Sequence, residues 1–478
     1  MKIPDLITGT MKGWARLGPR FLPFADAASP ELPLLRLLRL SLFQVSVGMA
    51  LVLLVGTLNR VMIVELGVPA ALVAIMISLP VLFAPMRALV GFKSDNHRSA
   101  LGWRRVPYIW KGTMVQFGGL AIMPFALLVL SGGGNAQQWP AWIGHLGAGL
   151  AFLLVGAGLH ITQTAGLALA TDLAPPEAQP KVVGLMYVSQ LLGMIVSALV
   201  FGALLEDFSP ARLIQVIQGS AVVTIALNIL ALWKQETRQR GMLHQPRREE
   251  PSFQEAWAHF LQGAQARRRL VAVGLGTMAF GMQDVLLEPY GGQVLGMTVG
   301  ATTQLTATLA IGGLIGFALA SRVLGRGADP FRMASAGALV GIPAFMTVIA
   351  AAPLQTPALF GLGVWMIGFG GGLFAHGTLT ATMQTAPPQQ VGLALGAWGA
   401  VQATAAGVAV ALGGVLRDVL ASLGGALHAE SQATPYTAVY SLEIVLLLAT
   451  VVAMAPLLRR TATAVPGPTP HHPASETP

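Results

Sequence analysis

Long apolar runs separated by short polar segments dominate this sequence. Each run holds about 20 residues, enough for a helix to cross the ~30 Å hydrocarbon core of a bilayer. In lipid the backbone must satisfy its own polar groups, so we expect helices, and continuous apolarity without alternation argues against an outer-membrane barrel. The pattern predicts twelve spans, near residues 38–58, 69–90, 106–130, 141–171, 181–205, 212–233, 270–290, 303–321, 331–352, 357–383, 391–415 and 436–457.

A polar, basic segment in the middle of the chain divides these spans into six plus six. We predict a cytoplasmic N-terminal segment (1–37), an N-terminal six-helix half (38–233), a cytoplasmic linker (234–269), a C-terminal six-helix half (270–457) and a disordered cytoplasmic tail (458–478). In the linker, Ser252 and Glu255 have the spacing of a helix capping box, and Phe253, Trp257 and Phe260 fall on one helical face. We expect an amphipathic helix on the membrane surface, with a flexible linker as the alternative.

The two halves share short sequence patterns at matching positions. Ala174-Pro-Pro176 and then Val183-Gly-Leu185 follow the fourth span, while Ala386-Pro-Pro388 and then Val391-Gly-Leu393 follow the tenth. Parallel repeats related by an axis along the membrane normal are the plan of major facilitator transporters. The predicted fold class is an all-α integral membrane protein with twelve transmembrane helices in two pseudo-symmetric six-helix halves, the major facilitator fold. Chance similarity between Gly- and Ala-rich helices is the alternative.

Charge supports this topology and sets the orientation. The chain is 54% hydrophobic and only 10% charged, with a net charge of +9, whereas a soluble domain has about 25% charged residues. With the N-terminus in the cytoplasm, all 29 Lys and Arg except Arg60, Arg212 and Arg417 lie on the cytoplasmic side. The positive-inside rule therefore predicts that both termini are cytoplasmic. The positive charge indicates contact with anionic membrane lipid. Because the topology accounts for it, we expect no nucleic-acid partner.

Four ionisable residues near the outer ends of the first and seventh spans form one candidate site. Arg60 and Glu65 lie in the first, and Asp284 and Glu288, four residues apart and so on one helical face, lie in the seventh. Ionisable groups inside a membrane are costly and usually face the bundle interior. We expect Arg60 to pair with Asp284 or Glu288 as an outer gate, with a fixed structural ion pair as the alternative. Proton coupling is less favoured, because we identify no further acidic residue in the middle of a span.

Two histidines in the inner halves of spans four and ten, His160 and His376, are candidate pigment ligands. A neutral imidazole nitrogen is a common metal ligand and fits the axial position of the magnesium in a chlorophyll. The alternative is that each histidine is a hydrogen-bonded packing residue. For His160 the nearby Thr162, Gln163 and Thr164 would supply the partners. No protein-bound metal is expected, since the chain has no cysteine and no paired histidine motif.

The loop between the second and third spans is short, basic and rich in turn-forming residues. It contains Gly91, Asp95, Arg98, Arg104 and Arg105. Two interpretations give the loop a function, as a latch between transport states or as a docking surface. The alternative is a topology signal alone, which needs only the positive charges and not Asp95 or Gly91.

No enzyme signature stands out in the chain. It has no phosphate-binding Gly-Lys-Ser/Thr loop, no zinc-protease motif and no nucleophile elbow. We therefore expect a binding or transport protein and no catalytic residues.

Several longer strings resemble the PucC/LhaA family, the bacteriochlorophyll-delivery branch of the major facilitator superfamily in phototrophic bacteria. The strings are Phe21-Leu-Pro-Phe-Ala-Asp26, Leu58-Asn-Arg-Val-Met-Ile-Val-Glu65, the loop from Gly91 to Trp110, Leu159-His-Ile-Thr-Gln-Thr-Ala-Gly-Leu-Ala-Leu-Ala-Thr-Asp172, Asp284-Val-Leu-Leu-Glu-Pro-Tyr290 and Gly392-Leu-Ala-Leu-Gly-Ala-Trp398. The resemblance runs from about residue 14 to residue 457. Within it, the loop after the second span is stretched relative to ordinary transporters.

This resemblance implies a light-harvesting antenna assembly factor in the bacterial inner (intracytoplasmic photosynthetic) membrane. The implied cargo is bacteriochlorophyll, and the implied partners are antenna polypeptides of the core or peripheral complex and a pigment synthase. Two other functions stay open on the residues alone. One is a gradient-coupled transporter of a small molecule that depends on Asp284 or Glu288, and the other is a pigment-free assembly scaffold.

Overall fold

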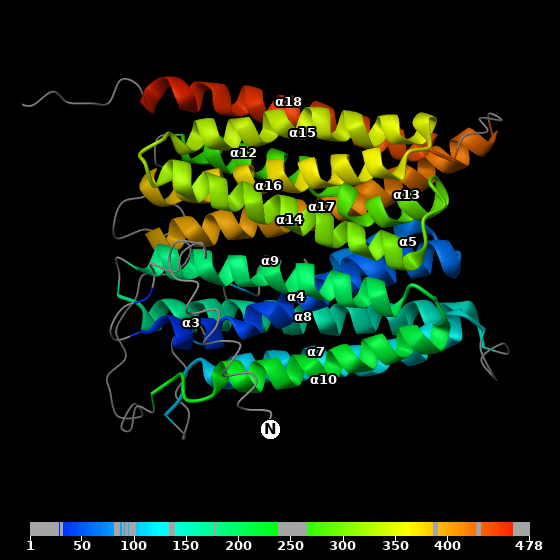
Figure 1. Ribbon diagram of the computed structural model, residues 1–478, viewed down its shortest axis with the longest axis horizontal. Coiled ribbons are helices and arrows are strands. Elements are labelled where there is room, and N and C mark those ends of the chain that lie inside the picture. Colours follow the sequence, from blue (N-terminus) through cyan, green and yellow to red (C-terminus); the bar gives the residue numbers. More distant parts are fainter. Residues whose placement is uncertain are drawn as a thin grey trace, which may run out of the picture.

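The computed structural model describes residues 32–80, 102–132, 139–175, 178–237, 265–385, 391–426 and 432–461, together with Ala28, Arg87, Val90 and Ser94. In these residues the chain forms helices joined by short turns, and no strand. Figure 1 shows the helices running roughly parallel along the long axis of the molecule.

The first half of the chain supplies the lower group of helices in Figure 1. They are α3 (Leu34–Leu40), α4 (Leu42–Leu51), η2 (Val52–Leu58), η3 (Val61–Glu65), α5 (Ala70–Ser78), α7 (Val106–Leu130), α8 (Ala141–Leu173), α9 (Gln179–Leu204) and α10 (Pro210–Leu232). The segments α3, α4, η2 and η3 follow one another along the first span, and η2 and η3 have π-helical geometry.

The second half supplies the upper group. Its helices are α12 (Ala266–Ala279), η7 (Met282–Val285), α13 (Leu287–Gln293), α14 (Val299–Leu324), α15 (Pro330–Leu354), α16 (Pro357–Thr385), α17 (Val391–Ala426) and α18 (Thr434–Thr461). The seventh span is broken into α12, the 3₁₀ turn η7 and α13.

Among the described residues, eleven helices are long and apolar enough to cross a membrane. They coincide with eleven of the twelve predicted spans. The remaining predicted span, near 69–90, is described only in part. The structure describes it as α5 and the turn that follows up to Pro80, and then at Arg87 and Val90. The prediction of an all-α membrane protein is confirmed by these helices.

Several helices begin at polar caps that the sequence supplies. Ser209 accepts a hydrogen bond from the backbone N–H of Arg212 at the start of α10, and Thr298 accepts one from Ala301 at the start of α14. Asp329 accepts from the N–H of Phe331 at the start of α15. Such caps satisfy backbone donors that have no partner inside the helix, so they define where these helices begin.

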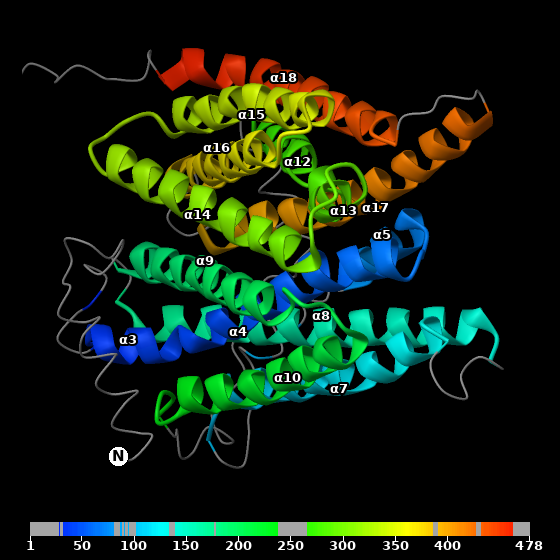
Figure 2. The ribbon, with the colours of Figure 1, turned by 45° about the vertical axis from the view of Figure 1, so that its right-hand side comes forward.

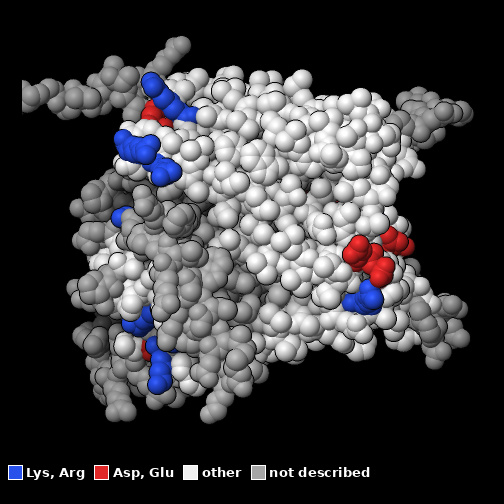
Figure 3. Space-filling view, in the orientation of Figure 1, with Lys and Arg blue, Asp and Glu red and all other residues white. Residues whose placement is uncertain are grey.

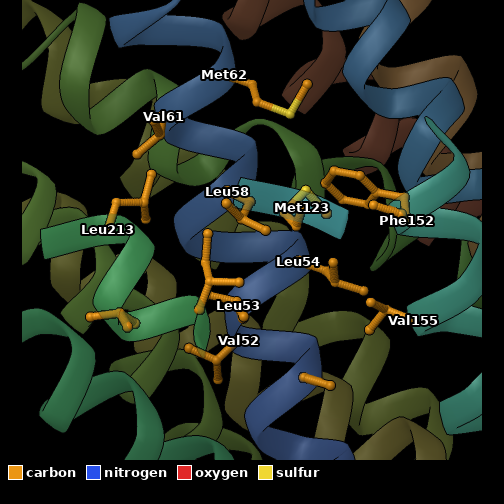
Figure 4. Close-up of a cluster of buried hydrophobic side chains, with 14 of the residues drawn as sticks. Val52, Leu53, Leu54, Leu58, Val61, Met62, Met123, Phe152, Val155 and Leu213 are labelled. Carbon is orange, nitrogen blue, oxygen red and sulfur yellow. The ribbon is translucent and has the colours of Figure 1, made fainter. Parts of the chain in front are cut away.

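Each half has its own apolar core. In the first half, Leu54 and Leu58 of the first span lie among side chains of the neighbouring helices, with Phe152 and Val155 of α8 on one side and Leu213 of α10 on the other (Figure 4). The core of the second half contains the buried rings of Tyr290, Phe345, Phe360, Tyr436 and Tyr440. The two cores hold the helices of each half together as a bundle.

The two bundles meet along two helix crossings, α9 on α14 and α5 on α17 (Figure 2). At the first crossing the backbones touch at glycines. A Cβ atom added to Gly300 would lie 2.6 Å from the carbonyl oxygen of Gly202 and 3.0 Å from the Cα of Glu206. Small residues allow this close approach of helices in membranes.

Charged side chains gather at the two ends of the molecule. On the face in Figure 3, Lys and Arg lie at one end, a group of acidic residues with a basic neighbour lies at the other, and an uncharged band separates them. The first, called here the basic end, carries Arg104, Lys181, Lys234, Arg322 and Arg326; the second, called the opposite end, carries Glu65, Glu206, Asp207, Arg212 and Asp418. The uncharged band indicates a multi-pass membrane protein.

Several predictions lie outside the described residues. These are the amphipathic helix of the linker, the tail beyond Thr461 and the loop residues Gly91, Asp95 and Arg98. The domain boundaries drawn at residues 37, 233, 269 and 457 therefore stay predictions, as does the cytoplasmic location of the basic end.

Candidate functional site

A cavity of about 380 Å³ lies between the two halves. We call it the central cavity. The first half lines it with residues of α4, η2, α5, α8 and α9, and the second half with residues of α12, η7 and α17. Its walls are mostly apolar, with Leu54, Ile77, Phe152 and Val410 among them. The polar lining residues are Arg87, His160, Gln163, Tyr187, Gln190, Thr277, Asp284 and Gln402.

His160 reaches this cavity from α8. Its Nδ1 atom is buried and has no hydrogen-bond partner among the described residues. One turn earlier, Gly156 lies directly against the ring of Pro80, where a Cβ atom would clash. The ring of Pro80 therefore fills the place of a side chain at Gly156, and it forms an apolar part of the wall near the imidazole.

The polar residues that follow His160 are engaged elsewhere. Thr162 donates to the carbonyl of Ile109 at 3.4 Å, and Thr164 accepts from the Nε of Arg87 at 3.2 Å. Gln163 accepts from Arg87 Nη2 at 3.1 Å and donates to Gln190 at 2.9 Å. Since all three side chains bond to other groups, the alternative in which they supply the hydrogen bonds of the His160 ring is not seen.

His376 lies at a different place. It is a buried residue of α16, and its ring packs on Phe317 of α14 with ring centroids 4.3 Å apart. It is not among the residues that line the central cavity. The two histidines predicted as pigment ligands therefore do not share a site, and only His160 faces the space between the halves.

A second, smaller cavity of about 140 Å³ adjoins the first, and we call it the small cavity. Leu51, Val55 and Asp284 line both cavities. Glu288 also lines the small cavity, where its Oε1 accepts a 2.5 Å hydrogen bond from the hydroxyl of Thr306 on α14. Asp284 and Glu288 therefore line one cavity, although Asp284 lies in the turn η7 and Glu288 in α13 and not on one continuous helix.

Arg60 does not make the ion pair that we expected. It pairs with Glu65 on its own span, and its Nη2 donates to the carbonyl of Met297 in the other half at 3.3 Å. No ion pair among the described residues joins Arg60 to Asp284 or Glu288. The reason is the π-helical geometry of η3, in which residues five apart lie on one face. An outer gate at these residues stays a prediction.

Asn59 makes a buried contact between the halves. Its Nδ2 donates to the carbonyl of Val285 at 2.9 Å. In a continuous helix this carbonyl would accept from the residue four positions on, but that residue is Pro289, which has no N–H. The proline thus explains why the helix does not continue from η7 into α13 and why the Val285 carbonyl takes a donor from the first span.

Sequence reasoning missed Glu443 of α18. This carboxylate is fully buried and its Oε1 accepts from the backbone N–H of Gln283 at 2.7 Å. The statement that no other acidic residue lies in the middle of a span was therefore wrong. The signal was available, because Glu443 is the single charged residue of the predicted span 436–457, and such residues usually have a role inside the bundle.

At the basic end, Arg104 and Arg105 are held within the first half. Asp172, at the end of α8, accepts from Arg105 Nε at 3.0 Å and from Arg104 at 3.4 Å. Glu236 accepts from the backbone N–H groups of Arg104, Arg105 and Val106 at 2.6 to 3.1 Å. Arg105 also donates to Ser94 at 2.6 Å. The roles of latch or docking surface stay predictions, and sequence reasoning assigned no role to Asp172 or Glu236.

Known sequences match nearly the whole chain. Residues 57–462 match the family model described as "PUCC protein". The chain is 68% identical to "Protein PucC" of Rhodovulum sulfidophilum over 85% of this chain and 90% of the relative. It is 61% identical to "Protein PucC" of Cereibacter sphaeroides over 93% of this chain and 96% of the relative. A more distant relative is the "Bacteriochlorophyll synthase 44.5 kDa chain" of Rhodobacter capsulatus. It is 29% identical over 81% of this chain and 88% of the relative.

Solved structures of transporters share the fold. A bacterial homologue of the human lysosomal transporter Spinster, inward-facing and occupied, has a TM-score of 0.64 at 14% identity, over 91% of this chain and 98% of that one. A bacterial homologue of the iron transporter ferroportin, in an outward-facing state, has a TM-score of 0.58 at 15% identity. The match covers 88% of this chain and 98% of that one. At such low identity the likeness shows the fold alone, and it confirms the major facilitator type.

Proposed function

Because this chain belongs to the PUCC protein family, we propose that it is an assembly factor for light-harvesting antenna complexes that binds bacteriochlorophyll between its two halves. Three of its relatives carry the name PucC, and a more distant one carries the name of a bacteriochlorophyll synthase chain. The fold supplies the frame, two bundles that enclose a cavity inside the membrane.

The observation that carries the proposal is the imidazole of His160. It faces a mostly apolar cavity, and its Nδ1 has no partner among the described residues. An unpaired buried polar atom is costly unless a ligand satisfies it. A neutral imidazole nitrogen can ligate the magnesium of a tetrapyrrole, while the mostly apolar walls of the cavity suit the face of a planar ring.

The size of the cavity bears on how the pigment is held. About 380 Å³ lies toward the lower end of the ~300–1,000 Å³ range of ligand sites. Bacteriochlorophyll has a long apolar tail as well as the ring. The ring therefore sits between the halves with its tail among the helices toward lipid, and the pigment reaches the site sideways from the bilayer.

The basic end is the proposed contact for partners. It carries Lys181, Lys234, Arg322 and Arg326, and the exposed positive charge suits both anionic lipid and acidic segments of other proteins. We place this end on the cytoplasmic side of the photosynthetic inner membrane, where antenna polypeptides and a pigment synthase are available. The loop residues Gly91, Asp95, Arg98 and Arg104 belong to this docking region in the proposal, whereas Arg105 is buried against Asp172 and Ser94 and would act by holding the loop.

Pigment analysis of gently purified protein tests the proposal. The unsubstituted protein is expected to carry stoichiometric bacteriochlorophyll. His160→Leu is expected to carry about tenfold less, because loss of the axial ligand would weaken binding by ~1.4 kcal/mol, which is a factor of ten in affinity. His145→Leu, near the opposite end of the same helix, is the matched control and should keep the pigment. His376→Leu separates the two predicted ligands and should also keep it, since His376 does not line the cavity.

Two results would contradict pigment binding. One is the absence of any tetrapyrrole from the unsubstituted protein. The other is unchanged antenna assembly in cells whose only copy carries both His160→Leu and His376→Leu. The second result would favour the pigment-free scaffold.

A gradient-coupled transporter of a small molecule remains the second candidate, and the small cavity with Asp284 and Glu288 favours it. It predicts substrate flux in proteoliposomes that falls when either carboxylate is replaced by its amide. Antenna assembly would then be unaffected by loss of His160.

A further inference from the structure

The first and seventh spans are both irregular where they face each other. The seventh is interrupted between α12 and α13, and the first is π-helical over Val52–Leu58 and Val61–Glu65. π-helical turns occur frequently at functional sites. Discontinuous helices at the contact between repeats supply the ends and carbonyls that hold ions in transporters. The irregular geometry therefore points to this contact as a binding site.

The two spans come together at Gly56. A Cβ atom there would lie 2.9 Å from the hydroxyl of Thr306 and 3.2 Å from Cδ of Glu288. A glycine at this position lets the first span press directly on the Glu288 carboxylate. The small cavity beside it, about 140 Å³, is lined by Gln283, Asp284, Glu288 and Thr306.

Oxygen acceptors outnumber donors in this cavity. Glu288 is 3% exposed and Gln283 is 2% exposed. The Oε2 of Glu288 and the Oε1 of Gln283 are buried without a hydrogen-bond partner among the described residues. The amide of Gln283 donates to Asp284 at 2.5 Å, and Thr306 uses its one donor on Glu288. Two oxygens of residues that line the small cavity are thus buried without a donor among the described residues.

The carboxylates of the cavity also have no direct ion-pair partner among the described residues. Arg60, the basic side chain nearest along the first span, is engaged by Glu65 and by the carbonyl of Met297. On the other side, Glu443 accepts from the backbone of Gln283 and adds a further acidic group. Buried ionisable groups in a membrane usually pair with a partner. The charge of Arg60 acts on Glu288 without a direct ion pair, and no Lys or Arg among the described residues forms an ion pair with Asp284 or Glu288.

We propose that the small cavity is a binding site for a small hard cation such as sodium, held by Asp284, Glu288, Gln283 and Thr306. These side chains offer oxygen ligands only, which is the set that alkali and alkaline-earth ions prefer. The described residues contain no cluster of three or more His, Asp or Glu side chains placed for a metal ion. The lining of the small cavity also holds no His or Cys, the side chains that zinc and copper prefer. A proton on a carboxylate can be shared with one neighbouring acceptor, whereas a cation can be contacted by all four side chains at once.

The cation has a structural consequence for the two halves. Its ligands come from the seventh and eighth spans, while Gly56 of the first span closes the cavity. A bound cation neutralises the carboxylates at the point where the halves touch and so stabilises their contact there. This role does not depend on pigment binding at His160.

Thermal unfolding of the full-length protein in detergent tests the site. The apparent Tm is measured at one pH and matched ionic strength in sodium, potassium and choline chloride, and separately in calcium chloride. Sodium is expected to raise the Tm by about 2 °C or more over choline, as a ligand of the native state does. A rise with calcium alone would assign the same site to a divalent ion.

The variants make the result specific. Glu288→Gln should abolish the difference between sodium and choline, whereas Glu206→Gln, an exposed carboxylate at the opposite end, should keep it. Thr306→Val keeps both carboxylates and removes one oxygen ligand. It should need about fivefold more sodium to reach half of the maximal Tm shift, which corresponds to a loss of ~1 kcal/mol in binding free energy. Equal Tm values in all salts, or a sodium shift that survives Glu288→Gln, would overturn the proposal. A Tm that follows pH but no cation would instead make it a proton site.

Discussion

At the scale of single residues, buried polar groups find partners that local sequence does not reveal. Arg60 and Glu65 are five residues apart, a spacing that places side chains on different faces of an α-helix but on one face of the π-helical segment η3. Asn59 satisfies the Val285 carbonyl because Pro289 has no N–H. In both cases a departure from regular helix geometry decides which groups meet.

Replacing Asn59 by leucine is expected to destabilise the contact between the halves. Leucine has a similar volume but donates no hydrogen bond, so the buried Val285 carbonyl loses its partner at a cost of about 1–3 kcal/mol. The apparent Tm, followed by the fluorescence of the tryptophans, should fall. Thr57→Val is the control, because the hydroxyls of Thr57 and Thr303 are 3.4 Å apart and form only a weak bond. A fall that is no larger in Asn59→Leu than in the control would contradict this role.

At the scale of elements, the start of α7 is fixed from outside the helix. Glu236 follows α10 and accepts from three successive N–H groups at the start of α7. A carboxylate there satisfies donors that have no partner in the helix and interacts favourably with the positive end of its dipole. The chain thus ties the sixth span to the third through one side chain.

Glu236→Ala is expected to lower stability by about 1–2 kcal/mol, the upper range for loss of a helix cap. Glu236→Gln keeps an acceptor but loses the charge, so its loss should be intermediate. Thermal unfolding measures both, and hydrogen exchange of the amides at the start of α7 localises the effect. If those amides exchanged no faster in Glu236→Ala, the cap would not hold the helix.

At the scale of the whole molecule, the halves are in contact through close helix crossings near the opposite end and are separated by cavities further in. The α9–α14 crossing depends on Gly202 and Gly300, whose backbones touch. The α5–α17 crossing is fixed by Asp418, which accepts from the N–H of Ala71 at 2.6 Å. These contacts position the walls of the central cavity and so decide which side chains face it.

Gly300→Ala is expected to push α9 and α14 apart, because the new Cβ atom would meet the carbonyl of Gly202 and the backbone of Glu206. Overpacking of this kind costs about 1–3 kcal/mol and should lower the Tm. Gly219→Ala in α10 is the matched control. A Cβ atom there meets nothing within 4 Å, and alanine favours a helix over glycine by about 1 kcal/mol. Equal effects of the two substitutions would show that the crossing tolerates a side chain.

The sequence by itself determined the all-helical membrane fold, eleven of the spans and the family. Hydrophobicity over about 20 residues and short motifs are local properties, and the bilayer imposes helices on apolar segments. It also identified His160, Asp284 and Glu288 as residues of interest. Only the tertiary structure decided that His160 faces the central cavity while His376 packs on Phe317. It also decided that Arg60 pairs with Glu65 and that Glu443 accepts a hydrogen bond from the backbone of Gln283. The physical reason is that these contacts depend on how helices distant in sequence pack and where they depart from regular geometry.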